Sequence, residues 1–256
     1  NLTENTQPAI FLTSYSIFQI AKREFGIDFS KSKYVAGHSL GEYSALSCSG
    51  SINFEDTLKI LKKRGKSMQE AVPKNQGGML AVLGSNLKSI EEIINNKKRN
   101  YECFIANDNS PQQVVISGLK KNIITLSEDL KSMDIKNIIL NVSAPFHCKL
   151  MDKATEIMKE EINNLNIQDL SIPLISNVTA SPVTSAKEIK KLLILQIEGR
   201  VRWLESINYM INNNTNNFIE IGPGKVLSGL IKKINKNVKM QNLNINSDFE
   251  SLKLNV

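Results

Sequence analysis

The chain has 256 residues, of which 41% are hydrophobic, and a formal net charge of +7. This length suits one large domain or a domain with a sizeable insertion. The longest apolar runs, such as 192–197, are far shorter than the roughly 20 residues that a membrane helix needs. The basic residues are spread along the chain, whereas nucleic-acid binding usually needs a concentrated basic surface. We therefore expect no membrane insertion and no nucleic-acid partner.

The first half of the chain has a simple predicted order of elements. A helix is expected over 7–25, because apolar residues recur at helical spacing up to Gly26. A short apolar strand over 34–36 follows, and a helix is expected after Ser39. A further helix over 54–72 is stopped by Pro73.

The pattern changes between Gly78 and Val142, where strand, helix, strand, strand, helix and strand follow one another. The predicted strands are 79–83, 103–106, 114–117 and 137–142, and the predicted helices are 88–96 and 121–133. This split β-α-β order is typical of ferredoxin-like domains. We predict an inserted ferredoxin-like domain at 74–143, with a four-stranded antiparallel sheet and two helices on one face.

Beyond this insertion the alternation of helices and strands resumes. We expect a helix over 151–164, a strand over 173–177, helices within 186–212, a strand over 218–221 and a helix over 225–234. The resulting prediction is an α/β fold: an α/β-hydrolase-like core with a parallel sheet, formed by 1–73 and 144–256, that carries the inserted domain.

A candidate nucleophile stands in Gly37-His38-Ser39-Leu40-Gly41, after a predicted strand and before a predicted helix. This pattern resembles a nucleophile elbow, a strained turn in which small residues let neighbouring backbone approach the serine closely. The helix that follows points N–H groups at the place where an oxyanion would form. An ordinary tight turn is the alternative.

A serine nucleophile needs a base, and the chain has only two histidines. His38 is adjacent to Ser39, so its side chain should point elsewhere and pack or hydrogen-bond locally. His147 remains as the candidate base, and we expect it within about 2.6–3.2 Å of Ser39. No Asp or Glu stands out as a third member, so a neutral carbonyl is a plausible partner for His147.

Five motifs together resemble malonyl-CoA:acyl carrier protein transacylases of the dissociated fatty acid synthase. They occur in the order found in that family and cover about 7–230. The motifs are Gly37-His38-Ser39-Leu40-Gly41-Glu42-Tyr43-Ser44-Ala45, Arg64-Gly65-Lys66-Ser67-Met68-Gln69, Asn107-Asp108-Asn109-Ser110-Pro111 with 113–118, Pro145-Phe146-His147, and Ile221-Gly222-Pro223-Gly224-Lys225-Val226-Leu227.

The resemblance implies a role for each matching residue. Ser39 would carry a malonyl ester, His147 would act as base and then as acid, and the Arg64 guanidinium would hold the malonyl carboxylate through two parallel hydrogen bonds. The main-chain carbonyl of Gln196 would orient His147, and the Leu40 backbone N–H would donate to the oxyanion.

Three further positions would line the pocket by the same resemblance: His38, Asn107 and Phe146. Phe146, next to His147, would also crowd out a methyl branch on the malonyl carbon. The family begins with a strand and a Gly-Gln-Gly segment that supplies a second oxyanion donor, whereas Thr6-Gln7-Pro8-Ala9 resembles a later stretch. We therefore expect the printed sequence to be truncated and to lack that donor.

The expected partners are malonyl-CoA and acyl carrier protein, with phosphopantetheine carried by the latter. We expect a monomer and no cofactor. A metal site is also not expected, because Cys48, Cys103 and Cys148 have no metal-ligand spacing. Carrier proteins of this pathway are acidic, so a basic docking surface is expected, with Lys66, Lys149, Arg200 and Arg202 as candidates. The richness in Asn, Lys and Ile, read as genome base bias, favours a plastid-type organelle over a bacterial cytoplasm.

Three other functions stay open at this point. A serine esterase or lipase would share Ser39 and His147 but would not need a cation in its acyl pocket, so the position of Arg64 separates the two enzymes. Arg64 could instead be a solvated charge within Lys62-Lys63-Arg64. The second alternative is an acyltransferase domain of a polyketide synthase, and the third is a non-catalytic module that binds carrier protein.

Overall fold

The computed structural model describes residues 3–96, 98–142 and 144–253. Its α-helices are α1 (Thr3–Arg23), α2 (Gly41–Cys48), α3 (Phe54–Glu70), α4 (Leu87–Ile94), α5 (Lys120–Ser132), α6 (Asp152–Asn164), α7 (Ala186–Gln196), α8 (Trp203–Asn212), α9 (Val226–Ile234) and α10 (Asn246–Lys253). Its strands are β1 (Val35–Ala36), β2 (Gly77–Leu83), β3 (Cys103–Ser110), β4 (Gln113–Leu119), β5 (Asn137–Ile139), β6 (Leu174–Ile175), β7 (Pro182–Val183), β8 (Asn217–Ile221) and β9 (Lys239–Leu243). Two short 3-10 helices are η1 (Phe29–Lys31) and η2 (Lys149–Met151).

The sequence patterns locate most of these elements within a few residues. The helix predicted over 7–25 begins earlier, at Thr3, with Pro8 inside it. Strand β3 runs on to Ser110, and β5 ends at Ile139. The patterns do not reveal β7, β9 or α10, because these elements are short or carry polar residues at half-buried positions.

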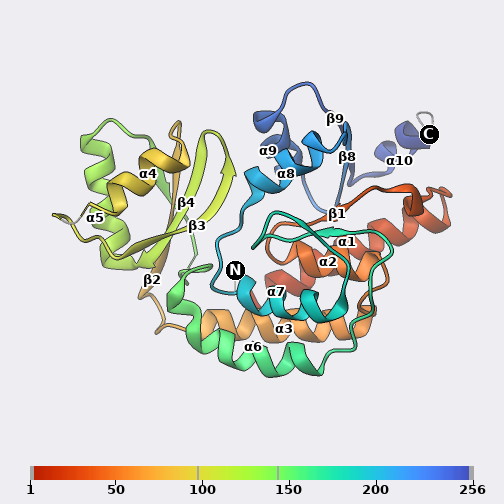
Figure 1. Cartoon of the computed structure of the whole chain (residues 1–256), viewed down its shortest axis with the longest axis horizontal. Coiled ribbons are helices and arrows are strands. Elements are labelled where there is room, and N and C mark those ends of the chain that lie inside the picture. Colours follow the sequence, from red (N-terminus) through yellow and green to blue (C-terminus); the bar gives the residue numbers. More distant parts are fainter. Residues whose placement is uncertain (1–2, 97, 143, 254–256) are drawn as a thin grey trace.

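Strands β2 to β5 form one antiparallel sheet in the order β3-β4-β2-β5. Leu80 and Val82 of β2 face one side, where they pack with apolar residues of α4 and α5. Met79 and Ala81 face the other side, in a small cluster that Phe146 contacts. Both helices therefore cover one face of a four-stranded antiparallel sheet, as predicted, and Figure 1 shows this unit at one end of the molecule.

The remaining strands do not form the single parallel sheet that the sequence analysis predicts. Strand β1 pairs in parallel with β6, and β6 pairs antiparallel with β7, so this sheet is mixed. Only a short turn, 176–181, joins β6 to β7, and a connection of that length permits antiparallel pairing only. Strands β8 and β9 form a separate parallel pair among the described residues.

A layer of helices packs beside β1 and β6 and supplies the largest apolar core. It buries Phe11 of α1, Leu61 of α3, Met158 of α6 and Leu193 of α7 together. Figure 1 shows α3, α6 and α7 side by side below α2. Within the part of the chain that the structure describes, no helix is long and apolar enough to cross a bilayer.

Candidate active site

A tight turn between β1 and α2 presents Ser39. The Ser39 backbone is left-handed, with φ 54°, a conformation that few residues other than glycine adopt. The Asn177 side chain, which follows β6, holds this turn from both sides: its Oδ1 accepts from the Ser39 N–H at 2.7 Å and its Nδ2 donates to the Gly37 carbonyl at 2.7 Å. The strained serine is therefore fixed by hydrogen bonds from a neighbouring strand end.

The two glycines of the turn have different steric requirements. A Cβ on Gly37 would lie 2.0 Å from the carbonyl carbon and oxygen of Gly41, which are backbone atoms. A Cβ on Gly41 would meet nothing within 4 Å. Only position 37 therefore has to be glycine, because only there does neighbouring backbone come as close as the nucleophile-elbow pattern implies.

We expect Gly37→Ala to lower the free energy of unfolding by roughly 3 kcal/mol or more, because the clashing backbone cannot move without displacing α2. Gly41→Ala, the matched control, should be within about 1 kcal/mol of the wild type, since alanine favours a helical first turn. Urea unfolding of the three proteins measures both values. Equal stability of the two variants would contradict the proposed contact.

His147 lies directly against the serine. Its Nε2 is 2.7 Å from Ser39 Oγ, within the distance that the sequence analysis predicts. Its Nδ1 is 2.9 Å from the main-chain carbonyl of Gln196. A carbonyl only accepts, so Nδ1 carries the proton and Nε2 is free to accept from the serine hydroxyl. A neutral main-chain carbonyl therefore orients His147, as the sequence analysis considered plausible.

The Gln196 carbonyl is available for this contact because Gln196 is the last residue of α7, where helix carbonyls lack an intrahelical partner. Burial, together with the nearby Arg64 charge, lowers the pKa of His147 to about 3. The imidazole is therefore neutral near pH 7, as a general base must be.

Stability should depend on pH through His147. Its pKa is about 3 in the folded chain and about 6.5 when unfolded, so the unfolded state binds more protons between these values. Stability is therefore lost as the pH falls below about 6.5. Between about pH 7.5 and about pH 5, the wild type should lose roughly 2 kcal/mol more than His147→Asn. Urea unfolding at both pH values tests this, and equal losses would contradict it.

Arg64 of α3 is buried, with 1% of its surface exposed, so its interpretation as a solvated charge is wrong. Its Nη1 donates to Gln7 Oε1 at 2.6 Å. Its Nη2 donates to Gln196 Oε1 at 2.8 Å and to Ser39 Oγ at 3.2 Å. The guanidinium therefore stands beside the serine hydroxyl, held there by two glutamine side chains.

Glu42 and Asn177 are among the residues of the site that the sequence analysis did not single out. Glu42 is buried in the first turn of α2, and its carboxylate accepts from the Asn177 backbone N–H at 2.6 Å and from the Gln196 amide. Burial raises the pKa of Glu42 to about 7. Glu42 directly follows the elbow, within the first of the five family motifs, and this was the available signal, whereas nothing local marks Asn177.

The other expected pocket residues lie in different surroundings. His38 points toward β3 and α8, with its Nε2 2.8 Å from Asn109 Oδ1 and its ring 5.5 Å from that of Trp203. Asn109 of β3 therefore contacts the residue next to the nucleophile. Asn107 is buried in β3, and its place in the pocket stays a prediction.

Phe146 is half-buried between the main core and the sheet of β2 to β5, next to His147. Leu40 directly precedes α2, and its backbone N–H makes no hydrogen bond with any part of the chain that the structure describes. That N–H can therefore serve a ligand, which is what the predicted oxyanion role requires.

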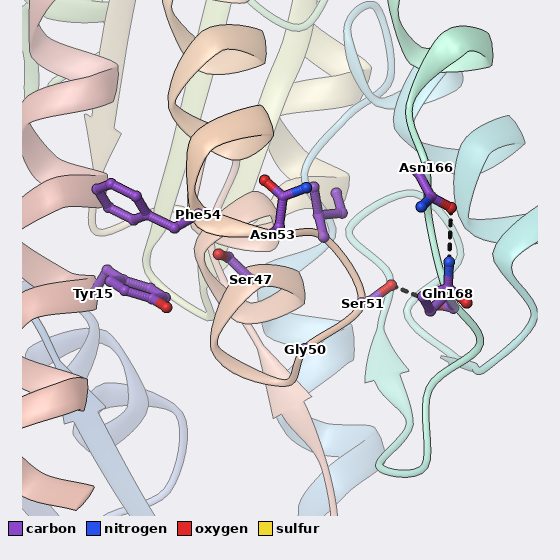
Figure 2. A pocket seen from close by; sticks show the side chains of 9 residues that line it. Tyr15, Ser47, Gly50, Ser51, Asn53, Phe54, Asn166 and Gln168 are labelled. Carbon is purple, nitrogen blue, oxygen red and sulfur yellow. Dashed lines mark hydrogen bonds between the residues drawn. The ribbon is translucent and has the colours of Figure 1, made fainter. Parts of the chain in front are cut away.

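A separate pocket of about 350 Å³ opens at the C-terminal end of α2, and Figure 2 shows its lining. Tyr15, Ser47 and Asn53 contribute to it, together with Gln168, whose side chain donates to Asn166 at 2.7 Å. It contains none of Ser39, His147 and Arg64. This pocket is therefore distinct from the candidate active site.

Comparison with known proteins gives a consistent result. The family described as acyl transferase domain matches residues 1–239. A malonyl CoA-acyl carrier protein transacylase of Bacillus subtilis (strain 168) is 43% identical over 240 residues, which are 93% of this chain and 74% of that protein.

Two solved structures superpose closely on this chain. The acyl-carrier-protein-S-malonyltransferase of Bartonella henselae has a TM-score of 0.93 at 40% identity, over 98% of this chain and 80% of that one. A malonyl-transacylase in complex with a type II PKS acyl-carrier protein has a TM-score of 0.94 at 33% identity, over 100% and 82% of the two chains. The chain therefore belongs to the acyl transferases and, among them, to the malonyl CoA-acyl carrier protein transacylase family.

Proposed function

We propose that this chain transfers a malonyl group from malonyl-CoA to the phosphopantetheine thiol of acyl carrier protein, for fatty acid synthesis, through an ester on Ser39. Membership of the transacylase family supports the reaction. The observation that carries the acyl specificity is the Arg64 guanidinium 3.2 Å from Ser39 Oγ. An acyl group on that oxygen would lie within reach of a buried cation, which suits a carboxylated acyl group.

The first half of the reaction forms the ester. His147 Nε2 takes the hydroxyl proton while Ser39 Oγ attacks the thioester carbonyl, and the Leu40 N–H donates to the oxyanion that results. The carbon–sulfur bond then breaks, and the His147 imidazolium returns its proton to the departing thiolate of CoA. The Gln196 carbonyl keeps Nδ1 protonated throughout and stabilises the imidazolium.

The second half reverses these steps with another thiol. The phosphopantetheine thiol of the carrier protein loses its proton to His147 and attacks the malonyl ester. Ser39 leaves with that proton, so the enzyme returns to its starting state. Acid and base are one residue in both halves, because the proton that His147 takes from the attacking group is the one it gives to the leaving group.

Arg64 would select malonyl over acetyl. The malonyl carboxylate can accept two parallel hydrogen bonds from the guanidinium, whereas an acetyl group has no carboxylate to accept them. Arg64 would exchange its contact with Ser39 Oγ for the carboxylate. A serine esterase has no use for this buried cation, so the esterase or lipase alternative is not favoured.

The finer description of the fold is also a proposal. An α/β-hydrolase-like core is supported by the turn of Ser39 between β1 and α2. A ferredoxin-like insertion is supported by the strand order β3-β4-β2-β5 with α4 and α5 on one face. Its boundaries at 74 and 143 come from the sequence, and residue 143 lies outside the described residues.

Docking of carrier protein on a basic surface is proposed with a narrower set of residues than the sequence analysis named. Arg200 pairs with Glu91 and Glu205, and Arg202 pairs with Glu205, so both guanidinium groups are already neutralised. Lys149 is exposed beside the Phe104 ring, and Lys66 lines a groove on α3 with Lys62 and Lys63. Of the four candidates, Lys66 and Lys149 are therefore better placed to meet an acidic partner. The absence of a cofactor, the monomeric state and the plastid-type location stay predictions.

Mass spectrometry of the intact chain after brief exposure to malonyl-CoA tests the function directly. The wild type should gain one malonyl group, and adding a carrier protein with its phosphopantetheine should remove it. Ser39→Ala should gain nothing. A gain that persists in Ser39→Ala, or an ester that only water removes, would overturn the proposed transfer.

A further inference from the structure

Glu42 presents two carboxylate oxygens to two different donors inside the protein. Oε1 accepts from the Asn177 backbone N–H at 2.6 Å, and Oε2 accepts from the Gln196 side-chain amide. With 1% of its surface exposed, Glu42 has no access to water in place of these donors. Both of its partners also touch the reacting serine: Asn177 Oδ1 accepts from the Ser39 N–H, and Gln196 Nε2 donates to the Ser39 carbonyl at 3.0 Å.

The Gln196 side chain can be satisfied in one orientation only. Its Nε2 faces two acceptors, the Glu42 carboxylate and the Ser39 carbonyl, while its Oε1 faces the Arg64 Nη2 donor at 2.8 Å. A flipped amide would place a donor against the guanidinium and an oxygen against two acceptors. The Glu42 carboxylate therefore favours the orientation in which Gln196 presents its oxygen to Arg64.

We propose that Glu42 is a positioning residue that aims the Arg64 guanidinium through the Gln196 amide and thereby sets the preference for malonyl over acetyl. The inference rests on the proposed function, because it concerns the acyl selectivity of the same site. Glu42 acts only through other residues: it touches neither His147 nor the Ser39 hydroxyl.

Electrostatics support the same arrangement. Arg64 is buried without a direct carboxylate partner among the described residues, and the Gln196 amide stands between it and Glu42. Burial raises the pKa of Glu42, but the Asn177 N–H, the Gln196 amide and the Arg64 charge all favour its ionised form. When ionised, Glu42 balances part of the guanidinium charge from behind the Gln196 amide, without occupying the place of a substrate carboxylate. A carboxylate in direct contact with Arg64 would instead compete with malonyl.

Glu42→Gln tests the orientation with almost no change in volume. Both donors that face Glu42 need acceptors, whereas a glutamine offers one oxygen and one NH₂ group. The Asn177 donor is a backbone N–H in a fixed position, so the mismatch falls on the Gln196 amide. Its contact with Arg64 is then lost or reversed.

The experiment compares the rates at which malonyl-CoA and acetyl-CoA acylate Ser39. Rapid-quench mass spectrometry measures both rates. The ratio of the two rates should fall about tenfold in Glu42→Gln, the effect of one hydrogen bond to a charged group. Acetylation should change less, because acetyl does not use Arg64. Glu55→Gln, which alters an exposed carboxylate paired with Lys59, is the matched control and should leave the ratio unchanged.

Two further variants separate positioning from a general structural role. In an Arg64→Ala background, Glu42→Gln should not change the ratio further, because the residue through which it acts is gone. Gln196→Met keeps the main-chain carbonyl for His147 and removes the amide, so it should reproduce the fall in the ratio. This second variant also decides the question if Glu42→Gln does not fold.

The outcomes distinguish this inference from the proposed function. A wild type that prefers malonyl, together with Glu42→Gln and Gln196→Met variants that keep that preference, would overturn the role of Glu42 and leave the transfer reaction intact. If Glu42→Gln slows malonylation and acetylation by the same factor, the role of Glu42 is structural and the proposed positioning is likewise overturned. A wild type that forms no malonyl ester would instead overturn the proposed function itself.

Discussion

Malonylation of Ser39 is expected to slow by about 10²–10⁴-fold in His147→Asn, the usual contribution of a general base. His147 is the base candidate because its Nε2 is 2.7 Å from Ser39 Oγ while its Nδ1 is held by the Gln196 carbonyl. Asparagine is the suitable replacement because His147 has a φ of 58°, and asparagine tolerates this left-handed backbone. Rapid-quench mass spectrometry, which measures the rate of ester formation in both proteins, tests this expectation.

His38→Asn is the matched control for this experiment. It removes the other histidine, which is adjacent to Ser39 in sequence but contacts Asn109 and Trp203. We expect its effect on the rate to be less than about tenfold, because it loses one hydrogen bond away from the reacting atoms. Equal losses in both variants, or a normal rate in His147→Asn, would show that the base is another group.

Arg64→Ala is expected to reduce the preference for malonyl over acetyl by roughly 10–150-fold, which corresponds to about 1.5–3 kcal/mol for hydrogen bonds to a charged group. The reason is geometric: the guanidinium lies beside Ser39 Oγ, in a buried site where water competes little for the malonyl carboxylate. Acetylation of Ser39 should change far less. Acylation by the two CoA thioesters, measured on both proteins, gives the ratio.

Arg64→Lys is the informative companion variant. Lysine keeps the positive charge but loses the two-donor fork, so it should recover part of the preference and not all of it. Because Gln7 and Gln196 lose their partner in Arg64→Ala, urea unfolding must accompany the kinetics. If Arg64→Ala slows malonylation and acetylation by the same factor, Arg64 is structural and the esterase alternative regains support.

The sequence by itself determined the outline of the reaction centre. The elbow is a local feature, because the glycine before the serine and the helix after it are neighbours in the chain. Elimination among two histidines predicted that His147 lies against Ser39 as the candidate base, although the two are 108 positions apart. The order of strands and helices between 78 and 142 predicted the antiparallel sheet, since periodicity and turn residues are local properties as well.

Only the tertiary structure decided how these pieces are held. Glu42 and Asn177 are ordinary polar residues in the sequence, and their importance arises because β6 and the end of α7 pack against the elbow from 135 and 154 positions away. The pairing of β7 with β6 likewise depends on a turn that no pattern marks. Local sequence specifies which atoms can react, but the partners that orient a buried carboxylate or guanidinium come from distant segments, because burial removes water and every polar group must find its partner within the fold.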